Sequence, residues 1–190
     1  MFNLLIWIMV GALLFTTCLL YVWLRQRVKE SASAVQNTGG HEALSGGGMQ
    51  GQPAPDFVLA DARQKAYALR DVIKDGVVLV FIDKMCPHCD SHLEMFLESS
   101  AHLSSLEKYV ILRGDDANLA REIELLYERK VTVLLGEQEI FDAYQIPAYP
   151  SFVYVNRMGN IDIITPVTGW VIQVAMMRMQ EAVQRSGKVG

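Results

Sequence analysis

The chain has 190 residues, which is room for one globular domain of ordinary size and some additional segments. Its formal net charge is −4, so it lacks the basic field that holds nucleic acid, and a nucleic-acid-binding protein is excluded. Hydrophobic residues make up 51% of the chain, a high share for a soluble domain, and the excess lies at the N-terminal end.

An uncharged apolar run at residues 4–24 has the length that crosses a bilayer, about 20 residues. Aromatic residues lie near its ends, as they do at membrane interfaces: Trp7, Tyr21 and Trp23. The competing interpretation is a signal peptide cleaved near the small residues at 32–34. No basic segment precedes the run, and charged residues separate it from that site. We therefore predict an uncleaved transmembrane helix with its basic flank over residues 1–29.

The next segment, residues 30–50, is small, polar and rich in glycine. Such a composition cannot bury enough apolar surface to offset its ordering entropy. We predict a flexible linker that holds a domain off the membrane. From residue 51 to residue 190 the composition is that of a globular domain.

Strands and helices alternate along this domain. A continuous run of β-branched and aliphatic residues at 77–82 is typical of a strand buried on both faces. Pro87 begins a predicted helix, and Asp115 and Asp116 are placed to cap another that runs to Arg129. Shorter strands are predicted at 109–112 and 131–135, and a short helix at 137–144.

The C-terminal part predicts a hairpin followed by a helix. The hairpin joins strands at 151–156 and 161–164 through a turn at 157–160. The helix spans about 170–185 and carries an apolar stripe that we interpret as core packing: Val171, Ala175, Met176, Met179 and Val183. The whole alternation predicts an α/β domain with a mixed sheet.

Two of the 3 cysteines are closely spaced, in Cys86-Pro87-His88-Cys89. The third, Cys18, lies in the apolar run and is interpreted as a packing residue. Two intervening residues at a helix start bring both sulfurs within bonding distance. We predict Cys86 at the N-cap, where the helix dipole favours a thiolate, and Pro87 at the first helical position. A protonated His88 would lower the pKa of Cys86 further, which stabilises the dithiol and makes the disulfide oxidising.

Two other interpretations of this motif stay open. A pair of cysteines at this spacing is half of a zinc site, but the sequence offers no second pair, only His88, His92 and His102 nearby. We expect no metal and no cofactor. A purely structural disulfide is the other alternative.

Further motifs carry a resemblance to a known family. Residues 51–59, GQPAPDFVL, resemble the opening of redoxin domains, and residues 144–151, YQIPAYPS, resemble a thioredoxin-like pattern with Pro150 at its cis-proline. The chain is similar to membrane-anchored thioredoxin-like proteins of cytochrome maturation and periplasmic disulfide exchange. Among these it most resembles the methylamine-utilisation accessory proteins, which share the N-terminal span, a following Arg-Gln, the CPxC dithiol and a Gly-Asp segment, here Gly114-Asp115.

The resemblance implies a thioredoxin-like fold, with a mixed central sheet flanked by helices, after the transmembrane helix. It implies a thiol–disulfide oxidoreductase in which Cys86 attacks and Cys89 resolves the mixed disulfide. Supporting roles fall to Pro87, His88, Tyr149 and Pro150. The implied partners are a protein substrate with cysteines and a redox protein that recycles the dithiol. The implied place is the inner membrane, by a single pass, with the domain in the periplasm.

Three departures from the family pattern bear on rate and direction. Met85 replaces a tryptophan, Val80 stands where many thioredoxins bury an acid, and Ala148 replaces a glycine. We expect an oxidant or isomerase that supports maturation of a specific protein. The alternatives are a reductant of the cytochrome-maturation type, a peroxiredoxin-like peroxidase and a copper chaperone. Against the last two stand Asp83, where peroxidases carry Thr or Ser, and the lack of any histidine after His102.

The charges around the apolar run favour the opposite orientation. Basic residues follow the run at Arg25, Arg27 and Lys29, and only the α-amino group precedes it. The positive-inside rule alone would place the domain in the cytoplasm. The resemblance implies the outer side, where disulfides persist, and we follow the resemblance.

Overall fold

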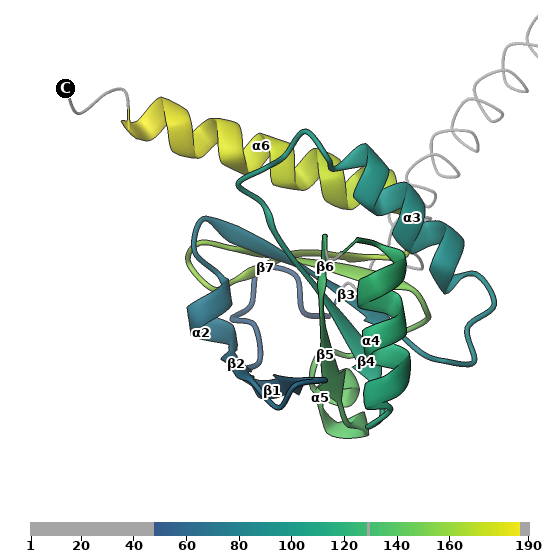
Figure 1. Ribbon diagram of the computed structural model, residues 1–190. Helices are drawn as coiled ribbons and strands as arrows, with labels where there is room; N and C mark the ends of the chain where they lie inside the picture. Colours follow the sequence, from purple (N-terminus) through teal and green to yellow (C-terminus); the bar gives the residue numbers. More distant parts are fainter. Residues whose placement is uncertain (1–47, 129, 187–190) are drawn as a thin grey trace, which may run out of the picture. The chain divides into compact units, whose positions relative to one another are not determined.

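A computed structural model describes residues 48–128 and 130–186 (Figure 1). The predicted anchor at 1–29 and most of the predicted linker at 30–50 lie outside these residues. Within the described ranges, no helix combines the length and the apolar character needed to cross a membrane.

A mixed sheet of seven strands lies at the centre of the described part, in the order β2-β1-β5-β4-β3-β6-β7. Strands β3, β4 and β5 run parallel, and the strands on both sides of this group are antiparallel to their neighbours. The strands are β1 (Val58–Asp61), β2 (Ala66–Ala68), β3 (Gly76–Ile82), β4 (Glu107–Arg113), β5 (Thr132–Gly136), β6 (Ser151–Asn156) and β7 (Ile161–Thr165). The predicted mixed sheet and the C-terminal hairpin are confirmed.

Strand β3 is buried along its whole length, as its apolar run predicts. Successive side chains of a strand point to opposite faces of the sheet. Val78, Val80 and Ile82 accordingly join one core cluster. Val77, Leu79 and Phe81 join the other. Because both faces bury apolar side chains, β3 holds the residues after its carboxyl end in a fixed position.

Helices cover both faces of the sheet (Figure 1). On one face lie α3 (Cys89–Ser99), α4 (Ala117–Leu126) and α6 (Thr168–Ser186), whose apolar side chains pack into the cluster with Val80. On the other lie α2 (Leu69–Val72) and α5 (Gln138–Ala143), which pack into the cluster with Leu79. In α6, Val171 and Ala175 are buried, as the predicted stripe requires.

Two local differences from the sequence predictions have physical causes. Helix α4 begins as expected, with the Asp116 carboxylate accepting the Leu119 N–H at 3.1 Å, but it ends at Leu126 instead of Arg129. Glu128 adopts a left-handed φ of 53°, which no α-helix continues through. The predictions also omit β1, β2 and α2, which have only three or four residues each, too few to show a periodic pattern.

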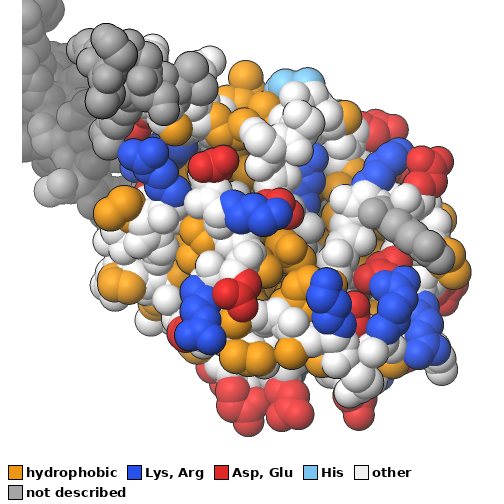
Figure 2. All heavy atoms as spheres, turned by 60° about the vertical axis from the view of Figure 1, so that its left-hand side comes forward, with side chains coloured by type: hydrophobic (Ala, Val, Ile, Leu, Met, Phe, Trp, Pro, Cys, Tyr) orange, Lys and Arg blue, Asp and Glu red, His pale blue; other side chains and the backbone are white. Residues whose placement is uncertain are grey.

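The surface carries charges of both signs. On the face shown in Figure 2, Lys and Arg side chains alternate with Asp and Glu, and hydrophobic atoms lie between them. This face has no continuous basic stripe of the kind that follows a nucleic-acid backbone. The picture agrees with the small negative net charge of −4.

Candidate active site

Cys86 and Cys89 form a disulfide between the carboxyl end of β3 and the start of α3, with their Cα atoms 5.5 Å apart. The two cysteines differ in exposure. Cys89 is buried against the core, whereas Cys86 is only partly buried. The sulfur of Cys86 is therefore the more accessible end of the bond.

The helix begins later than the sequence predicts. Its first residue is Cys89 and its N-cap is His88, so the prediction of Cys86 at the N-cap and Pro87 at the first helical position is wrong. The cause lies in the preceding turn, where the Cys86 N–H donates to the Asp83 carbonyl at 3.0 Å. His88, with φ −112° and ψ 0°, is the N-cap between this turn and the first helical residue, and its side chain makes no capping hydrogen bond.

Asp83 organises the turn that presents Cys86. Besides its carbonyl, its carboxylate Oδ1 accepts the Met85 N–H at 2.8 Å. Its Oδ2 lies 3.1 Å from Nη1 of Arg113, the last residue of the neighbouring strand β4. The turn is thus fixed from within and tied to the sheet from outside.

A hollow lies beside the disulfide, and we call it the dithiol groove. Its lining residues are Asp83, Met85, Cys86, Pro87, Arg113 and Tyr149. The side chain of Met85 is strongly exposed, at 81%. Tyr149 reaches the groove from the loop before β6 and packs edge-on against Phe141, with ring centroids 5.8 Å apart. The groove therefore offers apolar surface and one cation next to the accessible sulfur.

The loop before β6 confirms one expectation from the family pattern. The peptide bond between Tyr149 and Pro150 is cis. Pro150 is buried, and the Ser151 hydroxyl donates to the Ala148 carbonyl at 2.7 Å. This loop brings Tyr149 to the same groove as Cys86, although the two are far apart in sequence.

The predicted site residues thus gather in part. Cys86, Pro87 and Tyr149 line the groove, and Cys89 is buried in the core and joined to Cys86 by the disulfide. His88 is exposed at the N-cap and is not among the lining residues. The sequence analysis did not predict the pairing of Asp83 with Arg113. A signal was present, because carboxyl ends of adjacent parallel strands meet at one edge of a sheet.

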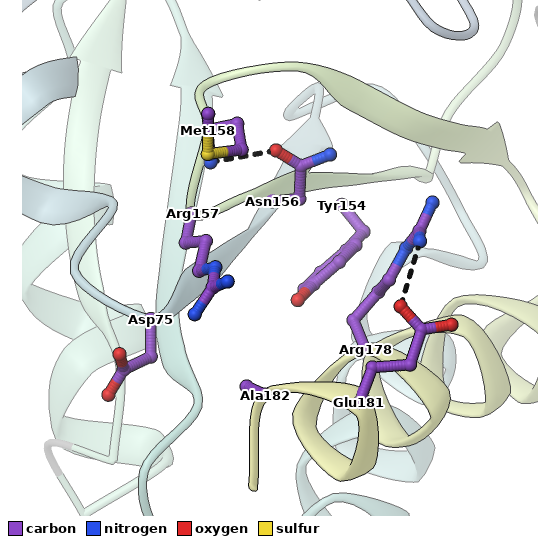
Figure 3. A pocket seen from close by; sticks show the side chains of 8 residues that line it. All are labelled: Asp75, Tyr154, Asn156, Arg157, Met158, Arg178, Glu181 and Ala182. Atoms are coloured by element: carbon purple, nitrogen blue, oxygen red, sulfur yellow. Dashed lines mark hydrogen bonds and ion pairs between the residues drawn. The ribbon is translucent and has the colours of Figure 1, made fainter. Parts of the chain in front are cut away.

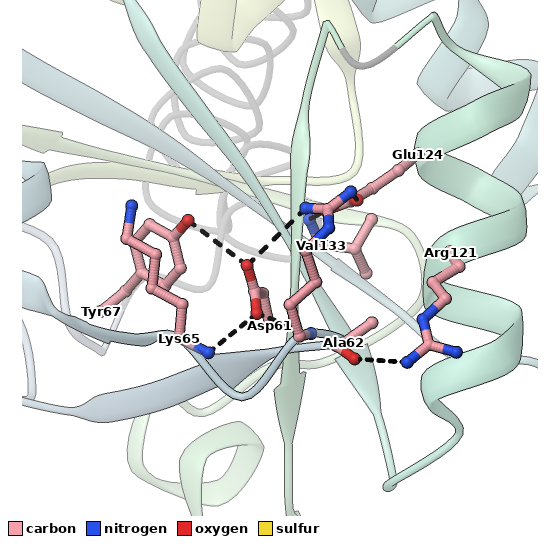
Figure 4. Close-up of polar contacts among 8 residues, drawn as sticks. Asp61, Ala62, Lys65, Tyr67, Arg121, Glu124 and Val133 are labelled. Carbon is pink, nitrogen blue, oxygen red and sulfur yellow. Dashed lines mark hydrogen bonds and ion pairs between the residues drawn. The ribbon is translucent and has the colours of Figure 1, made fainter.

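No acid lies beneath the dithiol at Val80, which is fully buried in the apolar cluster. The two buried carboxylates of the described residues are Asp61 and Glu124. Figure 4 shows them close together near Val133, between β1, β5 and α4. Strands β5 and β4 separate β1 from β3, so Asp61, at the end of β1, is about three strand spacings, roughly 14 Å, from the strand that leads to the dithiol. Glu124 is on α4 and accepts the Val133 N–H of β5.

Among the described residues, no group of three His, Cys, Asp or Glu side chains lies close enough to hold a metal ion. His92, considered as a ligand from the sequence, is partly buried, and its Nδ1 has no hydrogen-bond partner in the described part of the chain.

The sequence is similar to a known protein family and to a curated protein of that kind. The sequence model of the AhpC/TSA family matches residues 50–164. The chain is 26% identical over 133 residues to the thiol-disulfide oxidoreductase ResA of Bacillus subtilis (strain 168), covering 68% of this chain and 71% of that protein. The matched region contains the dithiol, the groove and the cis-proline loop.

Solved structures show the same fold. A putative protein disulfide isomerase from Bacteroides thetaiotaomicron superposes with a TM-score of 0.58 at 19% identity, over 72% of this chain and 94% of that one. A secreted Mycobacterium tuberculosis disulfide oxidoreductase, homologous to E. coli DsbE, gives 0.55 at 16% identity, over 64% and 95%. The predicted thioredoxin-like fold is confirmed.

Proposed function

This chain belongs to the AhpC/TSA family, and from that premise we propose that it exchanges disulfides with an extracytoplasmic partner protein, acting as an oxidant or isomerase. At the coarser level the chain is a thiol–disulfide oxidoreductase of the thioredoxin/redoxin type. The observation that carries the proposal is the Cys86–Cys89 disulfide, whose more accessible sulfur opens onto the dithiol groove.

The proposed exchange has two steps. A thiolate of the substrate attacks the Cys86 sulfur, the bond to Cys89 breaks, and Cys89 leaves as a thiolate that takes up a proton. A second substrate thiolate then attacks the substrate sulfur of this mixed disulfide and releases Cys86. Two electrons pass from the substrate to the dithiol, and a partner redox protein later removes them.

The roles of the two cysteines follow from exposure. The attacked sulfur must be reachable, and Cys86 is partly exposed where Cys89 is buried. Cys86→Ser should remove the reactive thiol, while Cys89→Ser should let Cys86 accumulate mixed disulfides. The test is to express each variant as the full-length chain, trap its mixed disulfides with partner proteins by alkylation, and identify them by mass spectrometry. Mixed disulfides that accumulate in Cys86→Ser and are missing in Cys89→Ser would reverse it.

The oxidising direction rests on cations near Cys86. Cys86 lies three residues before α3, so the helix dipole contributes less than an N-cap position would, because that effect fades within the first turn. Arg113 remains as a permanent cation on the wall of the dithiol groove and His88 as the imidazole of the motif, and stabilising a thiolate stabilises the dithiol. Val80 provides no acid to assist the reverse reaction.

The location is proposed from sequence alone. The uncharged run at 4–24 would anchor the protein in the inner membrane, with the redox domain in the periplasm, where disulfides persist. The full-length protein should resist carbonate extraction, and a topology reporter fused after Gly190 should be active on the outer side. A mature N-terminus at Val35 would show a cleaved signal peptide instead.

A peroxidase is the second candidate, and the redoxin-like opening within the family match favours it. A peroxidatic cysteine would reduce hydrogen peroxide and pass through a sulfenic acid. The purified dithiol form should react with peroxide no faster than an ordinary exposed thiol. Rapid peroxide consumption that depends on Cys86 would favour the peroxidase over the disulfide-exchange protein.

A further inference from the structure

An ion pair on the wall of the dithiol groove joins two parallel strands. The last rung between β3 and β4 pairs Ile82 with Leu112, so Asp83 and Arg113 are the next residues on each strand. Their side chains meet at 3.1 Å, between Oδ2 and Nη1. The register of the buried sheet therefore fixes both charges at the groove that contains Cys86.

The two partners have different surroundings. The Asp83 side chain is only 14% exposed and also accepts the Met85 N–H, whereas the Arg113 side chain is 42% exposed. A guanidinium has five N–H donors in a fixed fork, and the bond to Asp83 uses one. Arg113 therefore presents a permanent positive charge and further donors to the groove.

Reduction of the disulfide creates a charge in this groove. When Cys86 ionises, a thiolate forms in the groove that Arg113 and Asp83 also line, and the sheet has already fixed the positions of these two charges. An opposite charge nearby stabilises the thiolate, and a like charge destabilises it. The other charged or titratable side chains lie on the turn, the first turn of α3, the loop after β4 and the loop before β6: Lys84, His88, Asp90, His92, Asp115, Asp116 and Tyr149.

We propose that Arg113 and Asp83 are positioning residues that set the redox equilibrium of the dithiol by charge, with Arg113 favouring the Cys86 thiolate and Asp83 limiting that effect. This inference rests on the proposed function and deepens it. It assigns the tuning of the dithiol to the end of β4, outside the CPHC motif.

A charge mechanism predicts opposite signs for the two partners. Arg113→Gln removes the cation and leaves Asp83 unpaired, so the thiolate and with it the dithiol become less stable. Asp83→Asn removes the anion, frees Arg113, and keeps an oxygen that can accept the Met85 N–H, so the dithiol becomes more stable. If the pair only braced the turn, both substitutions would disturb it alike and shift the equilibrium in the same direction.

The test is equilibration of the full-length chain in glutathione buffers, with the state of Cys86 and Cys89 read from alkylated peptides by mass spectrometry. Arg113→Gln should shift the equilibrium toward the disulfide by about tenfold, which corresponds to about 30 mV. Asp83→Asn should shift it toward the dithiol, and Arg113→Lys should stay near wild type because it keeps the charge.

Arg178→Gln is the matched control. Arg178 also pairs with an aspartate, Asp162, at 2.7 Å, and its loss changes the net charge equally. It lines a different pocket with Asp75 (Figure 3), at the opposite end of β3 from Cys86. We expect no shift in this variant.

A second measurement follows the Cys86 thiolate directly. In a Cys89→Ser background, the pH dependence of Cys86 alkylation should move to higher pH with Arg113→Gln and to lower pH with Asp83→Asn. Shifts of one sign in both variants, or no shift, would overturn this inference while the wild-type chain still cycles. A wild-type chain that forms no dithiol in any buffer would overturn the proposed function as well.

Discussion

Two of the regions where an arginine of the described residues pairs with a carboxylate differ in how deeply the carboxylates are buried. At the dithiol groove, Asp83 pairs with Arg113 within reach of solvent and of Cys86. Between β1 and α4, Arg63 lies between two buried carboxylates, Asp61 and Glu124. Both arginines are partly exposed, at 55% for Arg63 and 42% for Arg113, so the contrast lies in the carboxylates: those of Asp61 and Glu124 are buried, and that of Asp83 borders the dithiol groove. We propose that the first pair serves stability and the second serves reactivity.

The buried region satisfies its polar atoms with the protein itself. Asp61 Oδ1 accepts the Arg63 and Lys65 N–H groups at 2.8 and 3.0 Å. Glu124 Oε1 accepts the Val133 N–H at 3.1 Å, and its Oε2 accepts from Arg63 Nη2 at 3.0 Å. These bonds tie the β1–β2 hairpin to β5 and α4 (Figure 4). A buried charge that loses such partners is costly, so this region should tolerate little change.

Glu124→Ala should produce the largest effect on stability. It leaves the buried Val133 N–H without its acceptor and Arg63 without its buried partner. We expect a loss of about 1 to 3 kcal/mol in the free energy of unfolding, measured by urea denaturation, mainly from the buried N–H that loses its acceptor. Glu122→Ala, an exposed site on the same helix, is the control and should stay within about 0.5 kcal/mol. Equal losses in both variants would contradict a special role for the buried cluster.

Tyr154 is a buried polar residue of the opposite kind, because its hydroxyl has no hydrogen-bond partner among the described residues. Figure 3 shows the ring beside Arg178 in the pocket near Arg157. Tyr154→Phe therefore removes no bond, and at neutral pH we expect a change of less than about 1 kcal/mol, or a gain. A loss as large as that of Glu124→Ala would show that burial alone, and not pairing, decides the cost.

The same tyrosine predicts a loss of stability at alkaline pH. Burial, with a smaller contribution from Asp162, raises the pKa of Tyr154 to about 12 from the ordinary value of 10.0. Between these values the unfolded chain loses the proton first, so stability falls as pH rises, by up to about 2 to 3 kcal/mol. Tyr154→Phe should flatten this part of the pH profile. An unchanged slope in the variant would assign the loss to other groups, such as Tyr144, whose pKa is also raised by burial.

Arg113→Gln should have the smallest effect on stability. Ion pairs with exposed partners contribute between about 0 and 1 kcal/mol, and the Arg113 side chain is 42% exposed. We expect less than about 1 kcal/mol of lost stability together with the tenfold redox shift described above. Urea denaturation of the oxidised protein measures the first quantity. A loss of several kcal/mol would place this pair in the same class as the buried cluster.

Strong patterns in the sequence predicted most of the fold. The apolar run of β3, the hairpin turn around Gly159 and the Asp116 cap each express a local rule and appear where expected. The β1–β2 hairpin was missed because its strands are short. Its turn also carries no glycine to mark it, since Gln64 adopts the positive φ of 65°.

The site was predicted in its chemistry but not in its electrostatics. The spacing of Cys86 and Cys89 indicated the disulfide, and the pattern at Pro150 indicated the cis bond. The late start of α3 follows from a turn that Asp83 closes with the Cys86 and Met85 N–H groups, which the helical pattern of the sequence does not show. The pairing of Asp83 with Arg113, thirty residues away, could not be predicted from a local pattern. Contacts between strands depend on register, which a local pattern does not reveal. The membrane anchor stays a prediction, since it lies outside the described residues.

The reduction potential of the Cys86–Cys89 pair decides whether this protein is an oxidant of other proteins. The full-length protein would be equilibrated in glutathione buffers, quenched, alkylated and analysed by mass spectrometry of the peptide that contains both cysteines. We expect reversible exchange of two electrons at a potential less negative than that of thioredoxin, about −270 mV, and a more negative value in His88→Ala. A potential at or below about −270 mV would contradict the oxidising role, and a disulfide that no buffer reduces would contradict the redox function itself.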